Sequence, residues 1–173
     1  MKKFLAHGGA FENISSENIT ISDIEDYLYL HTLRWQKESA AITENTMDFH
    51  KELCLTMSRS EHFRLFFAKY KNKRIAAISC FDINGRREFY YSGRTIDHSE
   101  ARAGKLIVLH SIFDTIERGL KIYDFGYGGD EYKFDFTDRY NTLKSFFLTR
   151  DKVMPDLKKL FPMYEQIELV DRN

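Results

Sequence analysis

Two short segments of the sequence combine glycines with charged and hydroxyl side chains in a way that suits group-transfer chemistry. One is Arg102-Ala103-Gly104-Lys105, and the other runs from Tyr123 to Phe134. Glycine lets a backbone turn sharply or approach a ligand closely, and polar residues in loops after strands frequently line binding sites. The first segment is a candidate anion site, and the second is a candidate reaction centre.

The second segment offers groups for acid–base and oxyanion chemistry. Lys133 can donate a hydrogen bond to a developing oxyanion, Tyr132 can protonate a leaving thiolate, and Asp130 can orient or activate an acceptor. Three earlier residues are predicted to contact the substrate: Asp124, Gly126 and Tyr127. On residue types alone, a solvated turn with a packed tyrosine explains the segment equally well.

The first segment lies between a predicted strand and a predicted helix. Backbone N–H groups at a helix start point outward, and the helix dipole favours negative charge there. The residues Arg102, Ala103, Gly104 and Lys105 therefore predict a pyrophosphate site. Two other interpretations stay open. Gly104 could serve close packing with its cationic neighbours solvated, or a helix beginning at Asp97 and capped with Glu100 would enclose Gly104 and remove the site.

The composition favours one globular domain and argues against several classes of partner. The chain has 173 residues, 43% of them hydrophobic and 15% aromatic, with 26 Lys and Arg against 26 Asp and Glu. A chain without formal net charge has no broad positive field to hold DNA or an anionic membrane. Cys54 and Cys80 match neither a metal-ligand spacing nor a disulfide framework. Because no apolar stretch is long enough to span a bilayer, the sequence predicts a cytoplasmic protein.

The elements that must position the two segments begin with helices. Residues 1–21 give weak signals and are predicted to form a short strand or extended lead-in, while residues 22–173 are predicted to form a single domain. Ser22 and Glu25 have the spacing of a capping box for a first helix. A second helix is expected over about 46–57, with Asn45 as its cap.

Strand signals follow the helices. Apolar runs over 62–70, 74–83 and 88–92, joined by short turns, predict an antiparallel meander, and Asn84-Gly85 is typical of a type I′ hairpin. The longest helix should end near Gly119, which suits the position after a helix C-terminus. The remaining predictions are a strand over 120–125 beside the third meander strand, a polar loop over 126–142, a strand over 143–148 and a short helix from Pro155.

Helical spacing also predicts which faces are buried. The first helix should bury Ile24, Tyr27, Leu28, His31 and Trp35. The second should bury Phe49, Leu53 and Met57, and the long helix Leu106, Leu109, Ile112, Phe113 and Ile116. His31 and His110 are interpreted as hydrogen-bonded core histidines, and the charges at the two meander turns, Arg74 and Arg87 among them, as solvated.

With these residues in view, the sequence from Leu33 to Lys133 resembles the acetyltransferase domain associated with cellulose-biosynthesis proteins of the CelD type, in the FemAB-like branch of the GNAT superfamily. The resemblance rests on Arg34-Trp35, on Ile75-Ala76-Ala77 with Tyr90-Tyr91-Ser92-Gly93, and on Gly104-Lys105-Leu106. Its most specific part is Glu117-Arg118-Gly119-Leu120 followed by Asp124-Phe125-Gly126, Asp130, Tyr132 and Lys133.

The resemblance implies an α/β fold of the GNAT type, a mixed and mainly antiparallel sheet flanked by helices. It implies acyl transfer from acetyl-CoA or another acyl-CoA to an amine or hydroxyl of a small molecule or glycan precursor, without a metal, in polysaccharide or cell-envelope metabolism. Lys133 is then expected near the acyl centre, and the donor pyrophosphate near Gly104. The strict pyrophosphate motif of the superfamily is degenerate here.

Family members usually carry two GNAT-like halves, and this chain resembles the C-terminal one. The resemblance therefore leaves three outcomes open for a lone half: it is inactive, it forms a homodimer, or a partner chain replaces the N-terminal half. Two other functions remain as alternatives, namely a non-catalytic binding or assembly module and a FemAB-like transferase that uses aminoacyl-tRNA. The latter needs a basic stripe for RNA, which the neutral sequence does not show.

Overall fold

The computed structural model describes residues 1–35, 39, 42–96 and 102–142. The chain separates into two compact units, residues 1–136 and 137–173. Every helix and strand of the described part belongs to the first unit. Three predictions fall outside the described residues: the Asp97–Glu100 cap, the strand over 143–148 and the helix from Pro155. The predicted loop over 126–142 is described and contains the short 3-10 helix η4 Glu131–Asp135. The division into a lead-in and one domain also stays a prediction.

A mixed α/β sheet organises the first unit, as the sequence predicts. Its order is β1-β2-β3-β4-β5, with β1 Gly9–Ile14, β2 Phe63–Tyr70, β3 Lys73–Ile83, β4 Arg86–Arg94 and β5 Ile122–Asp124. Strands β1 to β4 pair antiparallel, and β5 pairs parallel with β4. The expected meander is confirmed, as is the position of the fifth strand beside the third strand of that meander. Strand β1 forms one edge of the sheet, and it lies in residues 1–21, where the sequence gives only weak signals of secondary structure.

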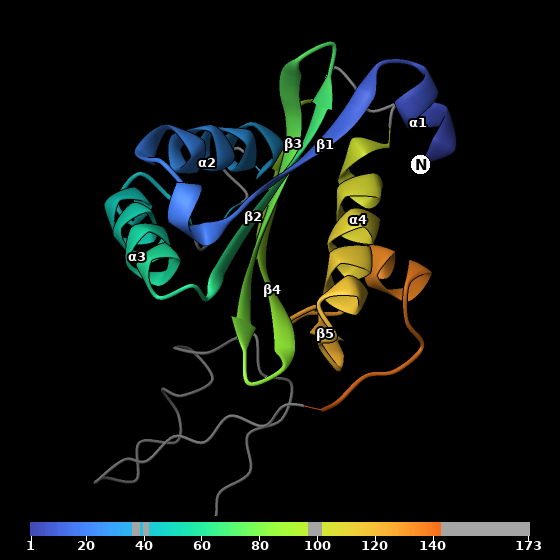
Figure 1. Ribbon diagram of the computed structural model, residues 1–173. Helices are drawn as coiled ribbons and strands as arrows, with labels where there is room; N and C mark the ends of the chain where they lie inside the picture. The colour runs from blue at the N-terminus through green and yellow to red at the C-terminus, as the bar shows by residue number, and fades with distance from the viewer. Residues whose placement is uncertain (36–38, 40–41, 97–101, 143–173) are drawn as a thin grey trace, which may run out of the picture. The chain divides into compact units, whose positions relative to one another are not determined.

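Helices cover both faces of this sheet (Figure 1). Helices α2 Ile21–Trp35 and α3 Met47–Arg59 lie on one face, and α4 Ala103–Glu117 lies on the other. Each face has its own core: Phe66, Ile78 and Ile107 belong to the α4 side, and Ile24 and Phe63 to the α2 and α3 side. Smaller elements complete the unit: α1 Lys2–Ala6, η1 Ser16–Asn18 and η4 Glu131–Asp135. No helix in this part of the chain has the length and apolar character needed to cross a membrane.

Turn chemistry is confirmed where the sequence is most explicit. Asn84 and Gly85 have φ values of 51° and 74°, which is the positive pair that a type I′ hairpin requires. Gly119 has a φ of 70° directly after the α4 C-terminus. At these positions backbone conformation selects the residue type, so local sequence is enough to predict the turn.

The helix caps differ from the predicted ones. Thr20 and Asp23 form the capping box of α2: the Thr20 N–H donates to Asp23 Oδ2 over 2.8 Å, and the Asp23 N–H donates to Thr20 Oγ1 over 3.2 Å. Ser22 and Glu25 have the same spacing, but Glu25 pairs with Lys51 of α3 instead. For α3 the N-cap is Thr46 and not Asn45. Tertiary ion pairs thus decide between two local motifs of equal quality.

The buried faces are predicted correctly for α2 but not for α3 and α4. Phe49 is 63% exposed, because α3 turns a different stripe inward: His50, Cys54 and Ser58. On α4, Phe113 and Ile116 are 46% and 65% exposed. The residues that α4 buries include three polar ones, Ser111, Asp114 and Thr115. Hydrophobic spacing cannot find a core face that carries polar groups.

Candidate active site

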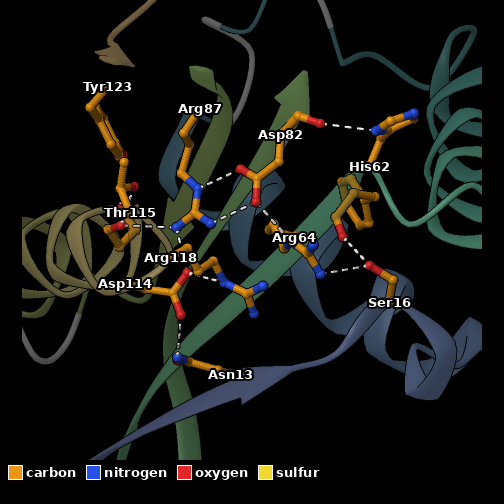
Figure 2. Close-up of polar contacts among 12 residues, drawn as sticks. Asn13, Ser16, His62, Arg64, Asp82, Arg87, Asp114, Thr115, Arg118 and Tyr123 are labelled. Atoms are coloured by element: carbon orange, nitrogen blue, oxygen red, sulfur yellow. Dashed lines mark hydrogen bonds and ion pairs between the residues drawn. The ribbon is translucent and has the colours of Figure 1, made fainter. Parts of the chain in front are cut away.

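A buried arginine explains the polar face of α4 and anchors the start of β4 (Figure 2). The Arg87 side chain has no solvent exposure, and its Nε and second terminal nitrogen donate to the Asp82 carboxylate over 2.7 and 2.8 Å. Its other terminal nitrogen pairs with Asp114 Oδ2 over 2.7 Å and donates to the Ser111 carbonyl over 2.9 Å. The prediction that Arg87 is a solvated turn charge is therefore wrong.

Two further charges complete this network. Arg64 of β2 donates from Nε to Asp82 Oδ2 over 2.8 Å, and Arg118 pairs with Asp114 over 2.9 Å. Burial acts to raise the pKa of Asp82, but hydrogen bonds from Arg87 and Arg64 outweigh it, so that pKa is lowered. Arg74, at the other meander turn, is also paired rather than solvated, with Glu12, Asp23 and Asp26. The two pairs of Asp82 link β3 to β2 and β4, and the pairs of Arg74 link β3 to β1 and α2.

Strand β4 has an open edge along its second half. Only Arg86, Arg87 and Glu88 pair with β5, at Ile122, Tyr123 and Asp124. Strand β4 continues to Arg94, and no strand of the described residues pairs with residues 89–94 on the β5 side. We call residues 89–94 the open edge of β4. Backbone groups that no strand pairs are available to bind a ligand at such an edge. The Ser92 carbonyl is an exception, because it accepts hydrogen bonds from His31 and Trp35 of α2.

A β-bulge lies near the start of the open edge. The β3–β4 register places Phe89 opposite Cys80 and Tyr91 opposite Ser79, so Tyr90 is an extra residue. Consecutive strand residues normally point to opposite faces. Here the Tyr90 and Tyr91 rings lie 4.4 Å apart, and both contact His50 of α3. The bulge therefore aims two tyrosines at the same face of the sheet, the side covered by α2 and α3.

The start of α4 adjoins the other end of the open edge. Helix α4 begins at Ala103, with Arg102 as a left-handed N-cap at φ 49°. Gly104 thus lies in the first helical turn, where a Cβ atom would lie 3.2 Å from Cδ of Arg94. Because Arg102 is left-handed, no continuous helix passes through it, and Gly104 is the second residue of α4. The first-turn N–H groups of α4 and the end of β4 meet at one place, as an anion site requires.

Positive charge gathers at this meeting point. Burial lowers the pKa of Arg94, and the nearby charge of Arg34 lowers it further. Arg102 is exposed, Ala103 is buried, and the Lys105 ammonium forms an ion pair with Asp135 of η4. This ion pair links the two segments that the sequence singles out, since η4 belongs to the second of them.

Lys133 is the organising residue of the second segment. It is 7% exposed, and its Nζ donates to the carbonyls of Tyr127 and Gly128 over 2.7 and 3.0 Å and lies 3.5 Å from that of Gly126. Asp130 Oδ2 is 3.2 Å from the same nitrogen. The ammonium therefore stabilises the conformation of residues 126–129, which we call the glycine loop. Its predicted role as an oxyanion donor remains a prediction.

The glycine loop lies against the open edge of β4. Gly126 has a φ of 70°, and a Cβ atom there would lie 3.4 Å from the Phe89 carbonyl oxygen. The Gly126 N–H donates to Asp124 Oδ1 over 2.8 Å, while Tyr127 is 74% exposed. Burial, with a smaller contribution from Asp130, raises the pKa of Tyr132 to about 12. A phenol with this pKa stays protonated at neutral pH and is able to act as a proton donor.

The sequence did not predict a cluster of histidine and tyrosine side chains on the face of β4 that α2 and α3 cover. His50 Nδ1 lies 2.7 Å from the Tyr90 hydroxyl. His31 donates from Nδ1 to the Ser92 carbonyl over 3.0 Å, and its Nε2 lies 3.0 Å from the Ser39 hydroxyl. Burial is the main cause that lowers the pKa of His31. The hydrogen bonds of His31 agree with its predicted role as a core histidine. The contact between His50 and the bulged Tyr90 could not be predicted from the helical spacing of apolar residues.

Comparisons with known proteins agree with this geometry. Residues 2–134 match the family model described as an acetyltransferase (GNAT) domain. No curated protein matches the chain. An aminoglycoside acetyltransferase from an uncultured soil metagenomic sample, solved in complex with sisomicin, is similar with a TM-score of 0.62 and 12% identity, over 85% of this chain and 99% of that one.

A second similar structure is the PaiA N-acetyltransferase of Thermoplasma acidophilum in complex with coenzyme A. Its TM-score is 0.54 at 16% identity, over 73% of this chain and 86% of that chain. At these identities the similarity shows a shared fold. The family match covers the open edge of β4, the start of α4 and the glycine loop.

Proposed function

Because the chain belongs to the GNAT acetyltransferase domain family, we propose that it is an acyl-CoA-dependent N- or O-acyltransferase, with acetyl-CoA as the first donor to test. One observation carries the proposal: the open edge of β4 has the α4 N-terminus at one end and the glycine loop of Lys133 near the other. From Phe89 to Arg94 the strand rises about 17 Å, which suits an extended pantetheine arm.

In this proposal the donor phosphates bind where α4 begins. The first-turn N–H groups at Gly104 and the cations Arg102 and Lys105 neutralise the diphosphate, with Arg94 beside them. The thioester then lies near the glycine loop, where Lys133 donates to the developing oxyanion. Tyr132, protonated at neutral pH, gives its proton to the leaving thiolate. Asp130 orients the acceptor, with Asp124, Gly126 and Tyr127 at the mouth of the site.

The acceptor class is an amine or hydroxyl on a small molecule or a glycan precursor. The aminoglycoside acetyltransferases among the structural neighbours favour an amine as the first choice. The CelD-type and FemAB-like resemblance favours a cytoplasmic enzyme of polysaccharide or cell-envelope metabolism. The aminoglycoside acetyltransferase that this chain covers over 99% of its length has no room in that chain for a second GNAT-like half, which supports activity in a lone unit. A homodimer or a partner chain stays a prediction.

Calorimetric titration with acetyl-CoA and with coenzyme A tests the donor assignment. We expect micromolar binding by the parent and at least a tenfold loss in Gly104→Asp, because a carboxylate in the first turn of α4 repels the diphosphate. Gly85→Asp is the matched control. It adds the same charge in the β3–β4 hairpin, at a left-handed position that aspartate tolerates.

The outcomes of this titration separate the site from the function. A folded parent protein that binds neither ligand contradicts the acyl-CoA-dependent function. Binding that survives in Gly104→Asp but is lost in Gly85→Asp would move the phosphate site away from the start of α4.

A further inference from the structure

On the α3 face of the open edge, we propose that Tyr90 and His50 form a relay that removes the proton from the attacking acceptor. Tyr90 contacts the acceptor, and His50 acts through Tyr90. The inference rests on the acyltransferase function proposed above. It adds Tyr90 as a catalytic residue and His50 as a residue that acts through it. Neither belongs to the two segments that the sequence singled out.

The geometry of the pair supports this assignment. The Tyr90 hydroxyl lies 2.7 Å from His50 Nδ1. His50 is 5% exposed, whereas Tyr90 is half-buried, so the tyrosine is the member that an acceptor can reach. Tyr90 directly follows Phe89, whose carbonyl adjoins the glycine loop at Gly126. The pair therefore lies next to the end of the open edge where the thioester is placed.

The bulge and the polar stripe of α3 both serve this contact. Without the extra residue in β4, alternation would point Tyr90 and Tyr91 to opposite faces of the sheet. Helix α3 turns His50 inward at a position where an apolar side chain would be the ordinary choice. A buried imidazole needs a hydrogen-bond partner, and the bulged tyrosine is one.

Among the described residues, the groups that face the pair come from four elements, namely β3, β4, α2 and α3. Tyr91 of β4 packs on the His50 ring, and Phe81 of β3 packs on the Tyr90 ring. His31 of α2 is close enough for His50 to lower its pKa, although burial is the larger cause. Cys54 of α3 adds to the effect of burial and of Tyr91, which together raise the pKa of Tyr90 above its ordinary value.

The step balances with groups already named. As the acceptor nitrogen or oxygen forms a bond to the acyl carbon and the C–S bond breaks, the Tyr90 oxygen takes the acceptor proton. At the same time the Tyr90 hydroxyl proton passes to neutral His50, because the raised pKa of Tyr90 disfavours a free tyrosinate. Tyr132 protonates the thiolate, His50 then returns its proton to water, and Tyr132 regains one from water.

The test uses the full chain with saturating acetyl-CoA and follows thiol release. The acceptor panel consists of sisomicin, spermidine, glucosamine and an amino-acid amide, and the best acceptor is carried forward. We expect Tyr90→Phe and His50→Gln to lower kcat about a hundredfold, within the range of general acid–base catalysis. Acetyl-CoA affinity by calorimetry and the thermal midpoint should stay close to the parent values.

Two readouts exclude a merely structural role. The parent kcat/KM should fall at acidic pH as the base is protonated, and His50→Gln should lose this limb because glutamine cannot take the proton. The double variant should be no slower than either single variant, since the residues act in one relay. Tyr29→Phe is the matched control for Tyr90→Phe, because it removes the hydroxyl of an exposed tyrosine on α2 that takes no part in the proposed site.

Each outcome decides between the two proposals. Parent turnover that Tyr90→Phe and His50→Gln leave unchanged overturns the relay and leaves the acyltransferase function standing. An additive double variant or a retained acidic limb in His50→Gln also overturns the relay. A parent that binds no acetyl-CoA overturns the acyltransferase function, and one that binds it but turns over no acceptor overturns both.

Discussion

At the scale of single residues, Lys133 shows how one side chain can have a structural and a chemical role. Its ammonium already donates hydrogen bonds to backbone carbonyls of residues 126–128, and it forms an ion pair with Asp130. An oxyanion that forms near Phe89 would compete for one of these donors. The proposed chemistry therefore requires the loop to give up one contact as charge develops on the acyl oxygen.

We expect Lys133→Met to lower the rate of acyl transfer about a hundredfold, the usual effect of removing one oxyanion donor. Methionine is unbranched and one atom shorter than lysine, and it removes the charge. Steady-state thiol release with acetyl-CoA measures the effect, and Lys121→Met, which changes an exposed lysine beside β5, should behave like the parent. Equal rates for Lys133→Met and the parent would show that Lys133 stabilises the loop but takes no part in catalysis.

The sequence predicted part of the candidate site and missed another part, for a physical reason. The segments at Gly104 and Lys133 are local, since each combines its glycines and charges within a few residues, and the structure joins them through Lys105 and Asp135. His50 and Tyr90 are far apart in the sequence and meet only because β4 is bulged. A bulge breaks the alternation on which strand predictions depend.

At the scale of elements, the crossing of α2 over β4 depends on one glycine. A Cβ atom on Gly93 would lie 2.1 Å from the His31 backbone nitrogen and 2.3 Å from the Leu30 carbonyl carbon. These are backbone atoms, so no side chain can move to make room. Close approach of α2 also brings His31 and Trp35 within hydrogen-bond distance of the Ser92 carbonyl.

Gly93→Ala should therefore lower the free energy of unfolding by about 3 kcal/mol or more, at or above the upper end of ordinary overpacking. Urea unfolding measures the change. Gly129→Ala is the matched control, because a Cβ atom there meets nothing within 4 Å. Similar stability of the two variants would show that α2 can shift away from β4 at little cost.

The elements themselves were predictable where conformation is local. The hairpin at Asn84 and the end of α4 at Gly119 follow from positive φ angles. The inward faces of α3 and α4 did not follow from sequence, because both carry polar residues that serve distant partners, Tyr90 for one helix and Arg87 for the other. A hydrophobic pattern reports the core only where the core is apolar.

At the scale of the whole molecule, two histidines with lowered pKa values make stability depend on pH. Burial is the main cause that lowers the pKa values of His31 and His110 in the folded state. Below about pH 6.5 the unfolded chain binds protons that these folded imidazoles do not. The free energy of unfolding should thus be highest above that pH and decline as the pH falls toward the folded pKa values.

Urea unfolding between pH 8 and pH 5 measures this decline. His110→Gln should reduce it, since one of the two imidazoles with a lowered pKa is removed. If the free energy of unfolding of His110→Gln falls with pH as steeply as that of the parent, His110 does not contribute to this pH dependence. Carboxylates with lowered pKa values, such as Asp82, lose their contribution only at more acidic pH, because an unfolded aspartate titrates near about 3.9.

The family match extends from residue 2 to residue 134, so it includes β1 together with the two segments and the bulge. The residues that carry the sequence resemblance begin at Leu33, and the N-terminal strand gives only weak signals in the sequence. Pairing of β1 with β2 over Gly9 to Ile14 supplies that strand with its register. Long-range pairing of this kind depends on the partner strand more than on local propensity.

The buried Arg87 network also constrains how the sequence can change over generations. Loss of Arg87 alone would leave two largely buried carboxylates, Asp82 and Asp114, with one cationic partner each, and loss of either acid would leave the buried guanidinium short of a counter-charge. The three positions thus form an epistatic unit, in which a first substitution is harmful until others accompany it. Lineages of this domain should keep the triad intact or replace it together with apolar residues of similar volume.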